Sequence, residues 1–560
     1  RIDGFTRERY AQQAEIAALK AKLEATEKYA QPQAQQTQES STPLRDNFDT
    51  DEEYISAQFE LEDYMDKNKK YELGVKYLKN IREDDGAIYY KALILIFANQ
   101  YFFMNDLDAS YDSIVEFLEG SEYAFNGVKE DTFDSIRGDA FGVAKKYFYQ
   151  ENYIKSLNLF KLIGGSYSYQ SSCYEKICKL KMNIETKKIG EMSNDLKGKV
   201  EKIIDILKLD FLPLSEDEQA PERKLAHYTS TYTTNKLLSK EKNKDKPSAF
   251  RLNTINNVND PSEGKLLTNY LESVKENSFY KPDFDERLHA FISCFTFNHD
   301  SLNQFRLYGK EDNKEASGVS LVFNKDFFKE NDSQSCMNNI FINRTIKNVK
   351  NNSDEGDSSA KRIEKQSVMR CVYIDPTSDY IHLAQRNRLT FFREFGRENL
   401  EGGSIPKAEI ECIEYENYID KKTEDFREAF IELKSIYNDA IDKKKSLKKL
   451  SKEDSDKIDS LLDMIILPLK YLVKHSAFQE EQECRMVYIT SLDDPKVKMD
   501  FGKFLYVEYE PEVKANLDKI YIAPAATQYQ PYLAKLLCGT NSLGKKIKIE
   551  LSNNPYRHTS

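Results

Sequence analysis

Two glutamates, Glu481 and Glu483, are the side chains in this sequence with the clearest capacity for chemistry. Residues two apart on a strand share one face, so their carboxylates should lie together, with Arg485, Val487 and Ile489 continuing that face. Paired carboxylates can stabilise a developing positive charge. They can also bind magnesium, with Asp260 as a third ligand in a nuclease, although the lysine that such a nuclease carries on a neighbouring strand is not evident. The same pair beside an arginine is also typical of a structural ion-pair network.

Other polar side chains stand within or beside apolar, strand-like runs. His227 could take part in binding or be a hydrogen-bonded structural histidine. Ser293 could line a pocket or simply be a small residue of a strand. Arg306 and Tyr308, together with Arg251, could contact a phosphate or brace the fold, because a planar guanidinium suits either use.

Several familiar chemistries are excluded because their sequence motifs are absent. The sequence has no phosphate-binding P-loop, no G-x-S-x-G, no H-E-x-x-H and no G-x-G-x-x-G. Five further histidines are widely separated, and the 8 cysteines form no C-x-x-C pair, so neither a metal site nor a disulfide scaffold is predicted. Unpaired cysteines favour a reducing compartment, and we expect a cytoplasmic protein.

Composition and charge narrow the class further. The 560 residues include 12% aromatic residues, which excludes a disordered chain. The 82 basic and 93 acidic residues give a net charge of −11, which argues against general binding of nucleic acid. The longest apolar run, 92–98, is far shorter than the roughly 20 residues that cross a bilayer, so no membrane partner is expected. The lysine clusters at 240–246 and 443–449 have acidic neighbours and indicate solvated surface.

The N-terminal part is predicted to be helical. Residues 1–30 carry a thin heptad pattern typical of a helix that can pair as a coiled coil, and the polar stretch 31–47 is predicted to be a disordered linker. Residues 48–187 form a predicted helical arm. Within it, small and aromatic residues recur at the spacing of tetratricopeptide helix pairs, most clearly at Ala144, Tyr147, Tyr153, Ser156, Phe160 and Ile163. This spacing predicts paired helices at about 144–149 and 152–163, with Ala144 and Ser156 at their close contact. An ordinary helical bundle is the alternative, and a repeat arm would bind a protein or peptide.

A second boundary is predicted at 188–222, where a helix over about 196–209 precedes the acidic linker SEDEQAPE. Beyond it, the segment 223–560 alternates short β-rich runs with helices, which is typical of an α+β domain. The expected helices are 262–278, 380–395, 424–442 and 457–475. The expected strands are LAHYT, AFRLN, HAFISCF, GVSLVF, VMRCVYI, CRMVYI, FLYVEY, KIYIA and KIKIEL. The fold class is therefore α+β multidomain, an all-α array followed by a mixed domain.

Eight short strings in the C-terminal part resemble, in their order, the bacterial family called domain of unknown function 2971. They are HYTS (227–230), FRLN (250–253), NDPSE (259–263), FISCFTFNHDSLNQFRLYG (291–309), GVSLVF (318–323), EQECR (481–485), IYIAP (520–524) and LSNNPYR (551–557). The resemblance covers residues 223–557. The family often has Trp at the positions of Phe305 and Cys484, which are expected to be packing sites.

The same order of polar residues also resembles the ADP-ribosyltransferase superfamily. That resemblance implies NAD as the substrate. It assigns the binding of NAD to His227 with Tyr228 and the nicotinamide pocket to Ser293. It assigns catalysis to Glu483, with Glu481 as the outer acid of the pair. Arg306 is placed among the cofactor-binding residues. No metal is implied.

Three hypotheses follow from these patterns. The first is an NAD-dependent ADP-ribosyltransferase or NAD glycohydrolase, coupled to the repeat arm as a sensor is coupled to an effector in bacterial defence systems. The second is a non-catalytic interaction or scaffolding protein. The third is the metal-dependent nuclease.

Overall fold

The computed structural model places most of the chain beyond residue 86. The described residues are 87–120, 130–164, 167–211, 220–240, 246–255, 264–272, 288–310, 314–329, 362–375, 377–396, 406–502, 504–538 and 546–556, with residues 72, 75, 78, 79 and 81. The predicted helix 1–30, the linker 31–47 and Asp260 lie outside them. The chain divides into two compact units, Arg1–Asp106 and Leu107–Ser560.

The first unit contains the most apolar segment of the sequence. Helix α4 (Ala87–Ala98) continues into a π-helical turn, η3 (Asn99–Phe103). Every residue of the run Ala92–Ala98 is buried. A short helix that is apolar on all sides is typical of a helix buried in a protein core, and burial in the core accounts for this apolar run.

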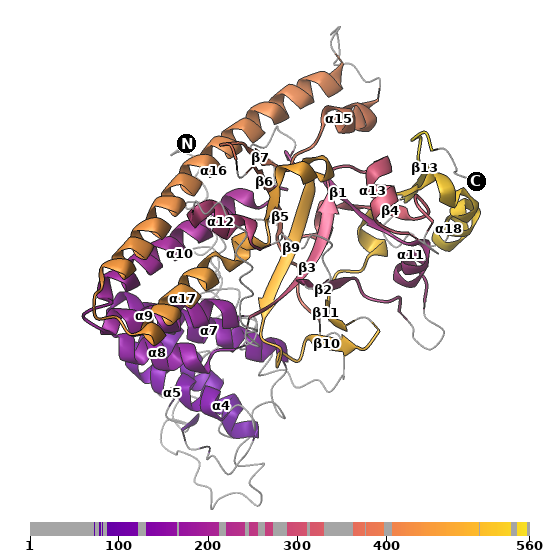
Figure 1. Cartoon of the computed structure of the whole chain (residues 1–560). Helices are drawn as coiled ribbons and strands as arrows, with labels where there is room; N and C mark the ends of the chain where they lie inside the picture. Colours follow the sequence, from indigo (N-terminus) through magenta and orange to yellow (C-terminus); the bar gives the residue numbers. More distant parts are fainter. Residues whose placement is uncertain are drawn as a thin grey trace, which may run out of the picture. The chain divides into compact units, whose positions relative to one another are not determined.

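The second unit opens with antiparallel helices that pack in chain order (Figure 1). They are α5 (Leu107–Glu119), α7 (Glu130–Tyr149), α8 (Tyr153–Leu162), α9 (Ser168–Met182) and α10 (Lys187–Leu207). Between α7 and α8, the Ser156 hydroxyl donates to the Ala144 carbonyl at 3.0 Å. Phe160 is buried and stacks on Tyr174, with ring centroids 5.0 Å apart. The close contact predicted for Ala144 and Ser156 is confirmed.

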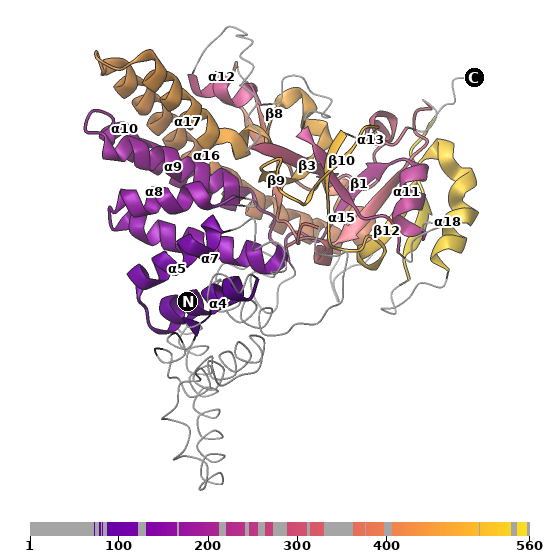
Figure 2. The same cartoon turned by 90° about the horizontal axis from the view of Figure 1, so that it is seen from below.

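Helix α10 connects this array to the C-terminal segment. It packs along α16 (Lys407–Ser446) and against α17 (Lys452–Lys470), as Figures 1 and 2 show. Its buried Leu196, Val200, Ile203 and Leu207 are spaced by four and three residues, which forms one apolar stripe. The helical array and the strands after residue 223 therefore belong to one compact unit. The domain bounds given above remain a prediction.

A large sheet dominates the C-terminal segment, and nearly all its neighbouring strands are antiparallel. Its order is β10 (Val497–Asp500), β11 (Phe504–Glu508), β2 (Arg251–Thr254), β3 (His289–Thr296), β1 (Lys224–Thr229), β4 (Val319–Asn324), β12 (Leu517–Ile522) and β13 (Lys548–Leu551). Strand β9 (Glu483–Thr490) pairs with β3 and with β5 (Val368–Arg370). A smaller sheet has the order β7 (Ile381–Leu383), β6 (Val372–Ile374) and β8 (Val473–His475). The observed mixture of helices and sheets is α+β.

All nine predicted β-rich runs contain strands, but two predicted helices were too long. Residues 381–383 form β7, and α15 (Arg388–Phe395) begins only after Asn387, whose side chain caps it by accepting from Thr390 N. The helix predicted over 457–475 ends at Lys470, and residues 473–475 form β8. The other short helical elements are α11 (Thr231–Leu238), α12 (Leu266–Glu272), α13 (Leu302–Leu307), α18 (Gln530–Leu537), η6 (Lys325–Phe327), η8 (Ser476–Glu481), η9 (Lys514–Asn516) and η10 (Pro524–Tyr529).

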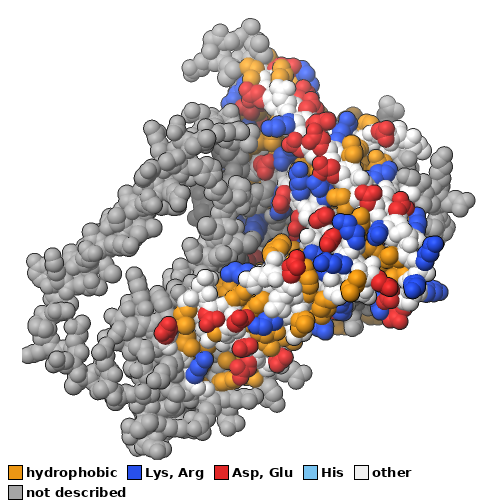
Figure 3. Space-filling view, turned by 90° about the vertical axis from the view of Figure 1, so that its left-hand side faces the viewer, with side chains coloured by type: hydrophobic (Ala, Val, Ile, Leu, Met, Phe, Trp, Pro, Cys, Tyr) orange, Lys and Arg blue, Asp and Glu red, His pale blue; other side chains and the backbone are white. Residues whose placement is uncertain are grey.

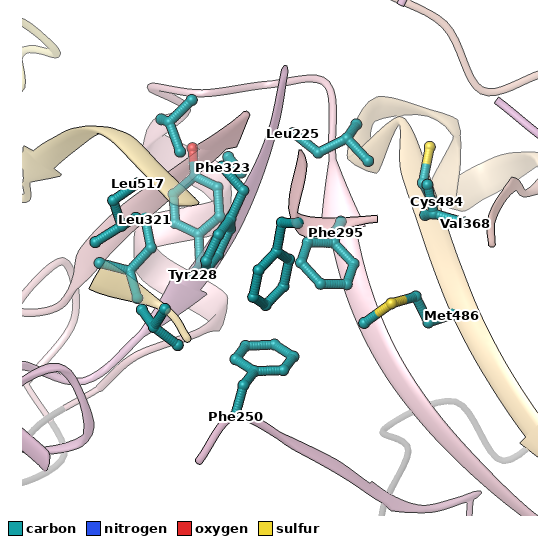
Figure 4. Packing of buried hydrophobic residues seen from close by; sticks show 14 of the residues in the cluster. Leu225, Tyr228, Phe250, Phe295, Leu321, Phe323, Val368, Cys484, Met486 and Leu517 are labelled. Carbon is teal, nitrogen blue, oxygen red and sulfur yellow. The ribbon is translucent and has the colours of Figure 1, made fainter. Parts of the chain in front are cut away.

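Aromatic side chains fill the core beside the large sheet. Figure 4 shows the rings of Phe250 and Phe295 between the β4 and β12 side chains on one side and Met486 of β9 on the other. The ring centroids of Phe250 and Phe295 are 5.8 Å apart. Phe305 and Cys484 are fully buried, as expected of packing sites.

The large sheet is open along one edge of β3. On one side, β3 pairs with β9 over its whole length, from His289 to Thr296. On the other side, β2 pairs with Phe291 and Ile292, and β1 pairs with Thr296. Among the described residues, no strand covers the edge of β3 at residues 293–295, so a gap lies between β1 and β2.

Candidate functional site

A cavity of about 570 Å³ lies at this gap in the sheet. Its walls come from β1, α11, β2, β3, α13, the segment from β8 to η8, and β9. The pairing register places Arg251 of β2, Cys294 and Thr296 of β3, and Glu483 and Arg485 of β9 on the same face of the sheet. These side chains therefore share the cavity because of the strand order.

The two glutamates reach the cavity from different elements, which corrects one expectation. Glu483 begins β9, but Glu481 is the last residue of the 3₁₀ helix η8 and does not lie on the strand. Between them, Gln482 has a left-handed backbone with φ of 45°. Its side-chain oxygen accepts from Gln385 N at 2.7 Å, which holds this turn. The turn directs both carboxylates to the same place.

Lys474 of β8 joins the two carboxylates. Its ammonium group lies 2.6 Å from Glu481 Oε2 and 2.7 Å from Glu483 Oε2. Arg485 donates to Glu483 through Nε at 2.7 Å and through Nη2 at 3.1 Å. The Tyr308 hydroxyl donates to Glu481 Oε1 at 3.0 Å. All four charged residues are at least nine-tenths buried, so two anions and two cations form a compact neutral cluster.

The cluster keeps its charges near neutral pH. Burial alone would raise the pKa of Glu483, but the positive charges of Arg485 and Lys474 outweigh it and lower this pKa to about 2. Burial would lower the pKa of Lys474, but the charge of Glu483 reverses this and raises it above the ordinary value. Burial, and then the Glu481 charge, raise the pKa of Tyr308, so its hydroxyl stays a donor. The cavity therefore presents Glu483 as an ionised, firmly oriented carboxylate.

His227 also lines this cavity, although the register of β1 with β3 places its side chain on the face of the sheet opposite to Glu483. Its Nδ1 lies 2.9 Å from the Cys294 carbonyl, which can only accept, so Nδ1 carries the proton and Nε2 is an acceptor. Burial lowers the pKa of His227, which keeps the ring uncharged. No described residue forms a hydrogen bond with Nε2. The Phe250 and Phe295 rings flank the imidazole, with centroids at 5.0 and 5.7 Å.

The remaining predicted site residues differ in their positions. Tyr228 lines the cavity, but its hydroxyl donates to Asn298 O at 2.7 Å and accepts from Ser301 N at 2.9 Å, so it braces the segment after β3. Ser293 also lines the cavity, yet the register places its side chain on the opposite face of β3 from Cys294 and Thr296. Arg306 does not line the cavity. It is exposed and pairs with Glu315 at 2.9 Å.

The residue that sequence reasoning missed is Lys474. It stands in the apolar run YLVKH, which was assigned to a helix, and the pairing of β8 with β6 alone brings it beside the glutamates. A lone lysine inside an apolar run was the available signal. The residues that the structure describes contain no group of three or more His, Cys, Asp and Glu side chains that could hold a metal ion. The Lys474 ammonium lies between the two carboxylates, where a bridging metal ion would sit.

The surface and the helices give coarser information. On the face shown in Figure 3, acidic and basic side chains are interspersed. Within the described part of the chain, no helix combines the length and the apolar character needed to cross a membrane. No protein-family model, curated protein or solved structure matches this chain. The resemblances to the 2971 family and to ADP-ribosyltransferases therefore rest on the residues quoted for them.

Proposed function

We propose that the cavity binds NAD and cleaves the bond between nicotinamide and ribose, passing ADP-ribose to water or to a macromolecule. The observation that carries the proposal is the convergence of His227, Glu481 and Glu483 on one cavity. His227 lies more than 250 positions before the two glutamates, and all three line the cavity at the open edge of β3. A volume of about 570 Å³ is within the range of small-molecule sites.

The chemistry requires few groups. As the bond breaks, its electron pair leaves with the nicotinamide nitrogen and positive charge develops on the ribose. Glu483, ionised at neutral pH, would stabilise that charge, since a fixed carboxylate needs no rearrangement at the moment of reaction. Nε2 of His227 would accept a hydrogen bond from a ribose hydroxyl. In hydrolysis, water forms the new bond to the ribose and passes its proton to a carboxylate or to solvent.

The test is incubation of the full chain with labelled NAD, with and without cell extract. We expect release of nicotinamide by the natural protein. Glu483→Gln should lower the rate by about 10²–10³-fold and leave NAD affinity nearly unchanged, because the charge acts mainly in the transition state. Glu315→Gln, which removes an exposed carboxylate outside the cavity, is the matched control. Absence of both NAD binding by calorimetry and nicotinamide release would contradict the proposal.

A second candidate is a non-catalytic interaction protein whose helical arm binds a protein or peptide. Two observations favour it. Lys474 and Arg485 already neutralise both carboxylates, as in a structural ion-pair network. Large apolar side chains are also exposed at the turns of the arm, at Tyr149, Ile154, Met182 and Ile184. This candidate predicts no nicotinamide release from either the natural protein or Glu483→Gln under the same conditions.

A further inference from the structure

We propose that Lys236 and Arg251 form an anion subsite in the same cavity, and that they bind the phosphate groups of a nucleotide ligand. This inference rests on the proposed function for the identity of that ligand as NAD. The position of the subsite and the chemistry of the anion come from the charges that line the cavity.

The charges of the cavity lining do not balance. Its charged side chains are the cations Lys236, Arg251, Lys474 and Arg485 and the anions Glu481 and Glu483. The two anions are engaged by Lys474 and Arg485 in the buried cluster. Lys236 and Arg251 remain as an excess of two positive charges on the wall, which favours a ligand with at least two negative charges.

Arg251 is held in place without being neutralised. Its guanidinium carbon lies 4.0 Å from the ring centroid of Tyr506, a cation–π contact that holds the group over the ring. Its nearest carboxylate oxygen is Glu508 Oε1 at 3.8 Å. Glu508 also pairs with Lys498 at 2.7 Å and with Arg362 at 3.6 Å. One carboxylate shared by three cations leaves most of the Arg251 charge available to a ligand.

Lys236 approaches the cavity from the last turn of α11. The ammonium group lies 4.6 Å from the ring centroid of Tyr232, and no described carboxylate forms an ion pair with it. The backbone N–H of Ser248 donates to the Lys236 carbonyl at 3.0 Å. This bond ties the segment that enters β2 to the end of α11, so the two cations come from adjoining pieces of chain.

The arrangement suits a nucleoside diphosphate group. A guanidinium fork and an ammonium together can surround a dianion with charge-assisted hydrogen bonds, which are roughly twice as strong as hydrogen bonds between neutral groups. The Tyr232 ring is more than half exposed beside Lys236 and can stack on a base. Because Arg251 lies on the same sheet face as Glu483, one ligand can reach the subsite and the carboxylates together.

The experiment measures binding to the full chain by calorimetry, with ADP, adenosine and inorganic pyrophosphate at low and moderate salt. We expect ADP and pyrophosphate to bind more weakly as salt rises, and adenosine to bind at least about tenfold more weakly than ADP. Lys236→Gln and Arg251→Gln should each weaken ADP binding by about tenfold, and the double variant more. Lys535→Gln, at an exposed position of α18, is the control.

Three outcomes separate this inference from the proposed function. Equal binding of ADP and adenosine, or unchanged ADP affinity in the folded double variant, overturns the subsite. Binding of ADP that depends on both cations, without nicotinamide release from NAD, supports the subsite and overturns NAD cleavage. Nicotinamide release that is unchanged in the double variant supports NAD cleavage and overturns the subsite. Arg251→Lys keeps the charge and loses the fork, so partial binding by this variant shows that a loss in Arg251→Gln is not caused by unfolding.

Discussion

At the scale of single residues, Lys474 decides whether two buried carboxylates can stay ionised side by side. Glu481 has two partners in the cluster, Lys474 and the Tyr308 hydroxyl. Glu483 is paired with Lys474 and with Arg485. Removing one partner of a buried ion pair leaves an uncompensated charge, which costs more than the pair itself contributes.

Lys474→Met should therefore lower the free energy of unfolding by about 3–5 kcal/mol at pH 8. The loss should be smaller at about pH 3. In the natural protein the charges of Arg485 and Lys474 outweigh burial and lower the pKa of Glu483 to about 2, so the stability that this pairing gives above pH 4.5 is lost as the pH falls toward the folded value. Urea unfolding at both pH values measures this. Lys470→Met, which removes a lysine paired with the partly exposed Asp463, is the control and should show a smaller, less pH-dependent change. Unchanged stability of Lys474→Met would mean that the cluster does not depend on its ammonium.

His299 gives a pH effect of its own. Burial, with the nearby charges of Arg386 and Lys224, lowers the pKa of His299 from 6.5 to about 4. Between these values the unfolded chain binds the proton and the folded chain does not, so stability present above pH 6.5 is lost as pH falls toward 4. The loss is at most about 3 kcal/mol, since one pKa unit corresponds to about 1.4 kcal/mol and the ring is partly exposed. His299→Gln should flatten the dependence of the unfolding free energy on pH between 6.5 and 4, which urea unfolding at several pH values measures.

A site residue could be predicted only where a short stretch of sequence carries the pattern that indicates it. Glu481 and Glu483 are two residues apart, so a local pattern could pair them, although not the turn that takes Glu481 off the strand. Arg306 looked like a phosphate ligand because of its type alone, and its pairing with Glu315 depends on how the chain folds back after α13. Lys474 reaches the glutamates only through strand pairing, which no local pattern contains.

At the scale of elements, the seam between α7 and α8 is the part that spacing predicted best. Small and aromatic residues three and four apart define one helical face, so Ala144 and Ser156 could be placed in contact before the structure was known. The missed strands β7, β8 and β10 have three or four residues each, too few for a period to emerge. The residues around β8 are mostly apolar, and such a run is equally compatible with an extension of the preceding helix.

The seam makes a direct prediction about stability. Phe160→Ala should lower the free energy of unfolding by about 3–5 kcal/mol, because the ring is buried between Phe141 and Tyr174 and its removal leaves a cavity. Tyr149→Ala removes a ring from the end of α7 that is 65% exposed, so it should change stability by less than about 0.5 kcal/mol. Urea unfolding followed by circular dichroism compares the two variants. Equal effects would show that the aromatic stripe does not hold these helices together.

At the scale of the larger unit, α10 packs both against the helical array and against the long helices of the C-terminal segment. The acidic stretch after this helix was expected to separate an arm from a C-terminal domain, since charged, proline-containing segments usually mark boundaries. In the structure the apolar stripe of α10 packs along α16, a helix that comes about 200 residues later, and the boundary itself stays a prediction. Composition can indicate a linker, but it cannot indicate that the helix before the linker packs against a helix that follows it.

Ile203→Ala tests whether this packing couples the two parts. Ile203 is fully buried in the apolar stripe of α10, so its truncation should lower stability by about 2–5 kcal/mol. Because α10 contacts both α9 and α16, amide exchange should accelerate together in α8 of the array and in β3 of the large sheet. Ile184→Ala changes the same residue type where the side chain is 94% exposed, and it should alter neither. Faster exchange confined to the helices before residue 208, with β3 unchanged, would show that α10 and α16 touch without stabilising each other, and the array would then unfold as a domain of its own.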